Sequence, residues 1–277
     1  MKILVSTGAL IGLANKRNYH LLKDIVPSLD CDGLEFMMYR CWYDQVDNVI
    51  QCLNELNIDI PVMHFEKSIG EDIVKEGIDK VVDRFEINCR IAQSIGAKKA
   101  VLHLWNGGTS DQYIEVNIDA YDTLRKIADA YEVELLIENV VCNKYNPFCN
   151  WNWLIQKYPD VSYIFDTKMA AFHAQLDGIY GFDKIDHVKH YHVNDYAGGY
   201  MDWDSLLSGV LPVGKGNIDF AKFFRFLKKI GYNDTITLEA SLLNKTTGEV
   251  EYERLDSQMK IIRSLLDKKT DVDFATN

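Results

Sequence analysis

The sequence has few prolines, no long hydrophobic run and no excess of basic residues. It contains only 5 prolines in 277 residues, and its apolar runs fall far short of the roughly 20 residues that a membrane span needs. Lysine and arginine total 30 against 41 aspartates and glutamates, which gives a net charge of −11. Broad binding to a phosphate backbone needs a basic face. We therefore expect neither a nucleic-acid nor a membrane partner.

The sequence contains six cysteines but none of the spacings typical of metal-binding or redox-active pairs. The six cysteines form no C-x-x-C pair, and the chain enters the strand-like run KILVS without a secretion signal. This indicates free thiols in a reducing compartment, so we expect a cytoplasmic protein. Cys52 and Cys89 fall on helical patterns and are expected in the core. Cys142 and Cys149 lie in a loop beyond Glu138, where no histidine or helix start would activate a thiol.

Short apolar runs alternate with longer amphipathic ones along the whole chain. Strands are predicted at residues 3–6, 33–36, 60–63, 99–102, 135–137, 163–165, 188–193 and 235–238. Helices are predicted at 74–95, 114–130, 151–157, 220–230 and 253–266. This alternation favours an α/β fold, a single (β/α)8 TIM barrel domain over residues 1–277. The polar residues 267–277 are expected to fray.

Polar residues stand at or just past the ends of seven predicted strands. They are Glu35, His64, His103, Glu138, Asp166, His192 and Glu239, separated by intervals of 26 to 47 residues. In a parallel barrel all strand carboxyl ends open on one face, where barrel active sites lie. We therefore expect these residues to form one constellation.

The run VKHYHVND, residues 188–195, carries two histidines that share one face of a strand, His190 and His192. Glu138, Asp166 and Glu239 should converge with one of these imidazoles. Carboxylates this close repel one another and raise each other's pKa, and a divalent cation removes that cost. Oxygen ligands with one histidine favour Mn²⁺ or Mg²⁺, although Zn²⁺ and Co²⁺ also accept them. The alternative is that each acid caps a helix or pairs with a surface lysine.

Short motifs at successive strands resemble one known family. They are GLEF (33–36), VMH (62–64), VLH (101–103), IEN (137–139), FDT (165–167), HYHVND (190–195) and GKGNIDF (214–220). Together they resemble the xylose isomerase-like barrels, which include sugar phosphate isomerases and epimerases, inosose dehydratases and endonuclease IV. The resemblance implies one metal held by Glu138, Asp166, a strand-seven histidine and Glu239. In the ketose epimerases the second histidine of H-x-H binds the metal, which corresponds to His192.

The resemblance also implies a chemistry. A cation bound to a hydroxyl and an adjacent carbonyl acidifies the neighbouring C–H and stabilises an enediolate. Family epimerases use two glutamates to move the proton, here Glu138 and Glu239. We expect a metal-dependent isomerase or epimerase of a small sugar or sugar phosphate. The alternatives are an inosose or keto-sugar dehydratase, which uses the same enolate, and a barrel that binds a sugar without turnover.

Two departures separate the chain from the ketose epimerases. Met169 stands where they carry a histidine, and Lys144 stands where a 3-epimerase has a glutamate. The segment ahead of Gly214 also lacks the Asp-x-His of endonuclease IV, so a three-zinc site could not be completed and DNA repair is not expected.

Further residues near the strand ends are predicted to contact the polyhydroxylated substrate: Glu35, His64, His103, Trp105, Lys168, His190 and Lys215. His64 and His103 could instead be packed at the barrel rim, and Lys168 could simply pair with Asp166. His190 could be a substrate ligand, a group supporting the metal ligands or a buried histidine. Lys215 lies in a Gly-Lys-Gly loop after strand seven, where barrels often bind phosphate, although the loop could only shape a turn. A homo-oligomer is compatible with the sequence.

Overall fold

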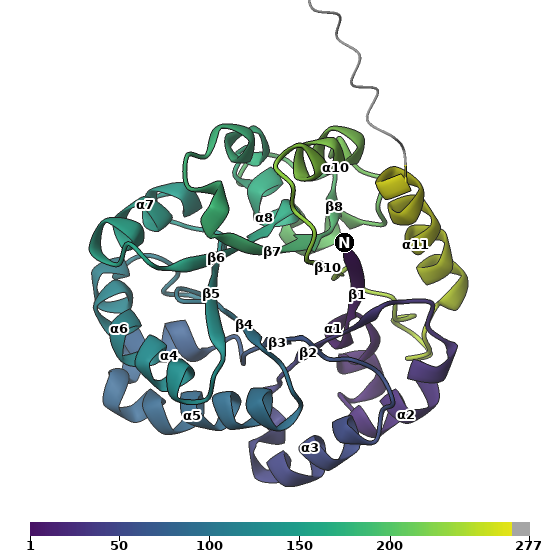
Figure 1. Ribbon diagram of the computed structural model, residues 1–277, viewed down its shortest axis with the longest axis horizontal. Coiled ribbons are helices and arrows are strands. Elements are labelled where there is room, and N and C mark those ends of the chain that lie inside the picture. Colours follow the sequence, from purple (N-terminus) through teal and green to yellow (C-terminus); the bar gives the residue numbers. More distant parts are fainter. Residues whose placement is uncertain (268–277) are drawn as a thin grey trace, which may run out of the picture.

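The computed structural model describes residues 1–267. Eight parallel strands close into a barrel in the order β1–β10–β7–β6–β5–β4–β3–β2, with helices around the outside (Figure 1). The barrel strands are β1 (Lys2–Ser6), β2 (Gly33–Met37), β3 (Val62–His64), β4 (Lys99–Leu102), β5 (Glu134–Glu138), β6 (Ser162–Asp166), β7 (Val188–Val193) and β10 (Thr235–Leu238). The expected (β/α)8 TIM barrel is confirmed.

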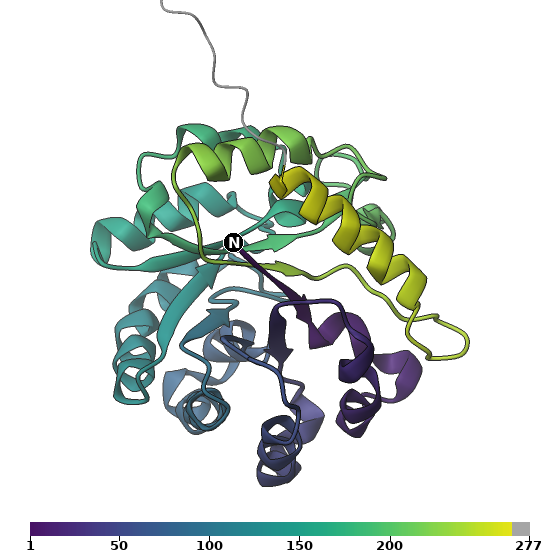
Figure 2. The same cartoon turned by 45° about the vertical axis from the view of Figure 1, so that its right-hand side comes forward.

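The helices pack against the outer surface of the barrel, as the turned view shows (Figure 2). They are α1 (Thr7–Leu10), α2 (Leu22–Ile25), α3 (Val46–Asn54), α4 (Ile69–Glu76), α5 (Ile78–Ser94), α6 (Ile114–Ala130), α7 (Pro147–Lys157), α8 (Thr167–Phe172), α9 (Ser205–Ser208), α10 (Phe220–Lys229) and α11 (Tyr252–Asp267). Of the expected frayed tail, Asp267 ends α11 and the rest lies outside the described residues. Within the described residues, no helix is both long enough and apolar enough to cross a membrane.

The helix predicted over residues 74–95 is wrong as a single element. Gly77 has φ +87°, which an α-helix cannot continue through, so the segment divides into α4 and α5. The helix predicted from residue 151 begins four residues earlier. Asn146 accepts the N–H of Cys149 as a side-chain cap, and Pro147 occupies the first helical position, where its missing N–H costs nothing.

The barrel interior has an apolar layer beneath a polar one. The apolar layer consists of Leu4, Val62, Val101, Leu136 and Ile164, all fully buried. Side chains two residues apart on a strand point the same way, so His64, Glu138 and Asp166 follow their apolar neighbours into the interior. The fold thereby places polar groups at the carboxyl end of the barrel.

Three of the six cysteines, Cys52, Cys89 and Cys142, are buried. Cys52 and Cys89 lie in the core, as predicted, and all six cysteines are unpaired. Burial raises the pKa of the Cys142 thiol far above its ordinary value, so its reactive thiolate form is disfavoured.

Candidate metal centre

Three carboxylates surround one imidazole nitrogen at the carboxyl end of the barrel. His192 Nδ1 lies 3.2 Å from Glu138 Oε1, 3.7 Å from Glu239 Oε2 and 3.9 Å from Asp166 Oδ2. Asp166 on β6 is the direct register partner of His192 on β7, which explains their proximity. Glu138 ends β5, and Glu239 follows β10. The structure therefore brings together the four residues predicted to hold the metal.

The donor atoms fit a single divalent ion. Ligand atoms about 2.0–2.2 Å from one ion lie roughly 3–4 Å from one another. The three carboxylate oxygens lie 3.2, 3.7 and 3.9 Å from His192 Nδ1, within that range. Glu138, Asp166 and His192 form a group whose ligand atoms lie within 4.8 Å of each other. One buried oxygen of the cluster, Glu239 Oε1, has no hydrogen-bond partner. Such an atom is costly unless a ligand satisfies it.

Asp166 offers the metal only one of its oxygens. Its Oδ1 accepts the N–H of Met169 at 2.8 Å and so caps α8. Its Oδ2 faces His192 and accepts a bond from Asn194 Nδ2 at 3.2 Å. Asn194 also reaches Glu239 Oε2 at 3.5 Å, so it steadies two carboxylates at once. This bridging amide was not predicted, although it follows the H-x-H motif by two residues.

His64 and His103 approach the same glutamate from β3 and the end of β4. Their Nε2 atoms lie 3.4 and 2.5 Å from Glu138 Oε2. His64 Nδ1 lies 2.8 Å from the carbonyl oxygen of Phe65, so it donates there and its Nε2 lone pair faces the carboxylate. Two facing lone pairs repel unless a proton or a cation lies between them. These three residues could therefore also hold a metal ion.

Glu35 and His190 lie on the other side of His192. The Nε2 atom of His192 is 2.9 Å from Glu35 Oε1, and His190 Nε2 is 3.0 Å from Glu35 Oε2. Glu35, His190 and His192 could also hold a metal by the spacing of their atoms. Every buried polar side-chain atom of these three residues already has a hydrogen-bond partner. This differs from the outer cluster, as we call Glu138, Asp166, His192 and Glu239, where Glu239 Oε1 has none. The contact of Glu35 and His190 with a substrate stays a prediction.

The sequence had suggested that the three carboxylates would raise one another's pKa. In the structure only the pKa of Asp166 is raised. Burial, Glu138 and Glu239 together raise the pKa of Asp166 to about 6 against the opposing effect of Lys168. Burial alone would also raise the pKa of Glu138, but His103 and His192 hold it well below its ordinary value. The pKa of Glu239 is likewise lowered, because His192 and a lysine outweigh burial. The imidazoles and this lysine therefore oppose the effect that burial has on the pKa of the two glutamates.

That lysine is Lys67, a half-buried residue in the loop after β3 that sequence reasoning missed. Burial alone would lower its pKa, but Glu239, Glu138, Asp166 and Glu35 raise it. Asn106 Nδ2 donates to the Lys67 carbonyl at 2.7 Å and holds this loop in place. The only sequence signal was its position three residues beyond His64, at a strand end.

Lys67 and Lys168 differ from the chain's other lysines near acids. Lys75 and Lys222, for example, close ion pairs of 2.6 Å with Glu71 and Asp177. Within residues 1–267, neither Lys67 nor Lys168 has a carboxylate oxygen within 4 Å. Lys168 is also half-buried. Their ammonium groups thus stay available to a ligand near the acidic cluster.

The Gly-Lys-Gly loop is wrapped around a protein carboxylate. Asp195 Oδ2 accepts the N–H groups of Gly214 and Gly216, both at 2.8 Å, and Oδ1 accepts that of Ile218 at 3.1 Å. The backbone amides that a phosphate would need are therefore occupied. Lys215 itself is exposed, and its contact with a substrate stays a prediction.

Trp105 lies in the hydrophobic core of the barrel. It is fully buried, and its indole N–H donates to the Val140 carbonyl at 3.0 Å. The structure gives this ring a packing role, and stacking on a sugar stays a prediction.

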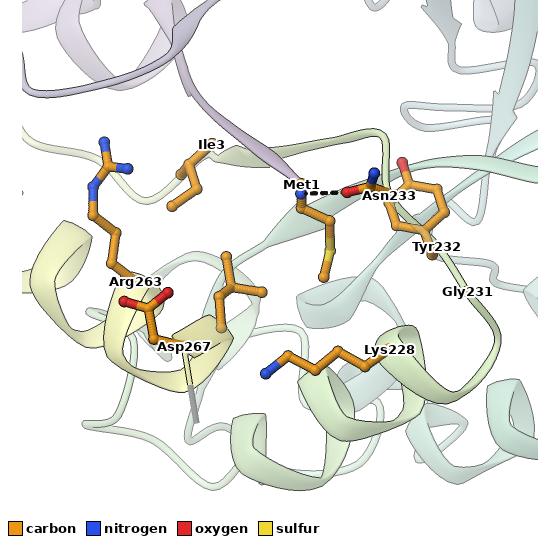
Figure 3. A pocket seen from close by; sticks show the side chains of 9 residues that line it. Met1, Ile3, Lys228, Gly231, Tyr232, Asn233, Arg263 and Asp267 are labelled. Carbon is orange, nitrogen blue, oxygen red and sulfur yellow. Dashed lines mark hydrogen bonds between the residues drawn. The ribbon is translucent and has the colours of Figure 1, made fainter. Parts of the chain in front are cut away.

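A separate pocket of about 470 Å³ lies at the opposite end of the barrel (Figure 3). It is lined by the start of β1, the turn before β10 and the end of α11, and Met1 donates to Asn233 Oδ1 there at 2.8 Å. Because barrel active sites lie at the carboxyl ends of the strands, we regard this pocket as unconnected with the metal centre.

Comparison with known proteins places the chain in a family. Residues 24–257 match the family model described as xylose isomerase-like TIM barrel. No curated protein sequence matches the chain. Solved structures match it over nearly its whole length at low sequence identity, which shows a shared fold. One is the IolI protein with a bound zinc atom, which has a TM-score of 0.72 at 16% identity, over 97% of this chain and 99% of that chain.

Two further structures carry different activities. D-psicose 3-epimerase from Clostridium cellulolyticum H10, determined with D-tagatose, has a TM-score of 0.69 at 14% identity, over 96% of this chain and 99% of that one. The probable 3-DHS dehydratase AsbF from Bacillus anthracis also has a TM-score of 0.69 at 14% identity, over 95% and 99% of the two chains. The matched segment covers most of the sequence, so the chain belongs to the xylose isomerase-like TIM barrel family.

Proposed function

We propose that the protein is a metal-dependent isomerase or epimerase acting on a small sugar or sugar derivative. One observation carries this proposal. Glu138 and Glu239 each turn one oxygen toward His192 Nδ1. The other oxygen of Glu239 is buried without a hydrogen-bond partner, and that of Glu138 lies 2.5 Å from His103 Nε2. Each glutamate can therefore ligate a cation through one oxygen and accept or return a proton through the other.

The four ligands are Glu138, Asp166, His192 and Glu239. Three carboxylates and one imidazole suit Mn²⁺ or Mg²⁺, and Zn²⁺ or Co²⁺ remain compatible. When bound, such a cation supplies a Lewis acid that acidifies the hydrogen beside the substrate carbonyl and offsets the charge of the resulting enediolate. Neighbouring groups, His103 and His192 for Glu138 and His192 and Lys67 for Glu239, lower the pKa of both glutamates and so favour the charged form, which is the form that accepts a proton.

The remaining polar groups would bind and orient the substrate. His64 and His103 flank Glu138 through their Nε2 atoms, and His103 Nδ1, which has no hydrogen-bond partner, can bond a substrate hydroxyl. Lys67 and Lys168 can bind an anionic group of the substrate, a phosphate or a carboxylate. The acidic net charge fits a small-molecule substrate better than nucleic acid, and we keep the cytoplasm as the proposed location.

A dehydratase is the second candidate. Met169 is buried where the ketose epimerases carry a histidine, and one structural neighbour is a probable dehydratase. Both reactions begin by removing a proton next to a carbonyl, so Glu138 and Glu239 keep their roles. They differ afterwards, because a dehydratase expels a β-hydroxyl whereas an isomerase or epimerase reprotonates the carbon.

Solvent hydrogen exchange tests the proposed proton transfer. Candidate keto-sugars, sugar phosphates and inososes are incubated in D₂O with Mn²⁺ and followed by mass spectrometry. The wild-type protein should place deuterium on a substrate carbon, with an isomer or a dehydrated product identifying the reaction. Glu138→Gln and Glu239→Gln should each lower exchange by roughly 10²–10⁴-fold.

Glu134→Gln is the matched control, because Glu134 lies at the opposite end of the same strand as Glu138 and is exposed. It should exchange like the wild type. Firm binding of a polyol by the metal-loaded protein without exchange across the panel would replace both enzyme proposals by a binding protein.

A further inference from the structure

His192 is held from two opposite edges of its ring. Its Nδ1 faces the three carboxylates of the metal centre, while its Nε2 lies 2.9 and 3.0 Å from the two oxygens of Glu35. Glu35 comes from β2, on the other side of β1 and β10 in the barrel order, and is fully buried. A buried carboxylate from a distant strand thus contacts the back of one proposed ligand.

Glu35 is itself fixed by the strands that carry the metal centre. Thr237 Oγ1 on β10 donates to Glu35 Oε2 at 2.7 Å, and Thr237 is the register partner of His192. His190 Nε2 lies 3.0 Å from the same oxygen, and His190 Nδ1 lies 2.8 Å from Thr235 Oγ1. The carboxylate therefore has little freedom to rotate away from His192.

The inner group of Glu35, His190 and His192 differs from the outer cluster in one respect. Its buried polar side-chain atoms all have hydrogen-bond partners, whereas Glu239 in the metal centre keeps an oxygen without one. A cation gains most where donor atoms lack partners, so the outer cluster is the better metal site and the inner group the better support.

We propose that Glu35 is a positioning residue that orients His192 for the metal, with Thr237 holding Glu35 in place. The nitrogen that donates to Glu35 carries the proton, which leaves the lone pair of Nδ1 directed at the metal centre. A carboxylate bonded to the far nitrogen also makes an imidazole a more basic ligand. The inference rests on the proposed metal site and assigns Glu35 a role other than substrate contact.

Two neighbouring threonines give a matched test. Thr237→Val removes the donor to Glu35 together with a 2.8 Å contact to His190 Nε2, whereas Thr235→Val removes only the 2.8 Å contact to His190 Nδ1 and so controls for a loss at His190. Direct titration of the chelated protein with Mn²⁺ should show weaker affinity for Thr237→Val and near wild-type affinity for Thr235→Val. Glu35→Gln, which keeps an acceptor but no charge, should lower affinity by about tenfold, and Glu35→Ala by up to about 100-fold.

The Co²⁺ absorption spectrum gives a readout that general destabilisation would not produce. Glu35→Gln should shift the visible bands of the Co²⁺-loaded protein, because the basicity and orientation of His192 change, while Thr235→Val should leave them in place. Unchanged affinity and spectrum in Glu35→Gln, beside a wild type that binds metal, would overturn the role of Glu35 and leave the proposed function standing. A wild type that binds no divalent metal would overturn the metal site and this inference together.

Discussion

Replacing Asp195 by asparagine should lower the free energy of unfolding by about 3–5 kcal/mol. The fully buried carboxylate accepts four backbone N–H groups, two on each oxygen. Those of Gly214 and Gly216 bond to Oδ2, and those of Tyr196 and Ile218 bond to Oδ1. Asparagine keeps one acceptor oxygen, so in either orientation its NH₂ group faces two N–H donors.

The magnitude follows from those two lost bonds. A hydrogen bond to a charged group contributes about 1.5–3 kcal/mol, and losing two gives about 3–6 kcal/mol. Water can reach the exposed Gly214 and relieve part of this cost, which brings the expectation to about 3–5 kcal/mol. Domains are stable by only about 5–15 kcal/mol, so the effect should be large in urea unfolding.

Asp202→Asn is the control, because Asp202 lies in the same connection between β7 and α10 but is exposed and makes a single local bond to the Asp204 N–H. It should change stability by less than about 0.5 kcal/mol. Asp195→Ala should be unstable and partly restored by formate, which can occupy the vacated amides. An Asp195→Asn variant as stable as the wild type would refute the view that this carboxylate organises the loop.

Two further predictions concern pH and substrate charge. His173 accepts the Cys142 N–H at 2.9 Å, and burial lowers its pKa to about 4. Between pH 6.5 and 4, His173 binds a proton in the unfolded chain but not in the folded one, so stability falls as pH falls. From pH 7.5 to 5, wild type should lose about 2 kcal/mol more in urea unfolding than His173→Gln, and equal losses would contradict this. Lys67→Met and Lys168→Met should weaken binding of anionic sugars by about 10- to 100-fold with little effect on neutral ones, measured by calorimetry, whereas an equal loss in Lys215→Met would move the anion to the loop.

The fold was predictable because its signal is repeated. Eight apolar runs, each separated from the next by about the length of one strand–helix unit, specify a parallel barrel. A parallel barrel brings the carboxyl ends of its strands to one face. Glu138, Asp166, His192 and Glu239 were expected to converge for that reason, since each stands at or near the end of a strand, and the structure brings them together. The break at Gly77 was not predicted, because a glycine within a helical pattern is often tolerated.

The parts that could not be predicted depend on contacts between loops. Lys67 lies in a loop without periodicity, and only the packing of that loop brings its charge to the carboxylates. Asp195 was visible at the end of HYHVND, but nothing in the chain order indicated that the Gly-Lys-Gly amides would close on it. Glu35 was identified as a polar strand end, yet its position beside His192 follows from the barrel's closure across β1 and β10.

Metal stoichiometry tests the central claim most directly. The protein is stripped with a chelator, reloaded with Mn²⁺, freed of excess ion and measured by inductively coupled plasma mass spectrometry, with its melting temperature recorded before and after. Wild type and Glu134→Gln should retain one ion per chain and melt at a higher temperature when loaded, because binding stabilises the folded state. Asp166→Asn and Glu239→Gln should retain much less metal, and their melting temperatures should rise little on loading. Undiminished metal content in both variants would contradict the assignment of the metal to this cluster.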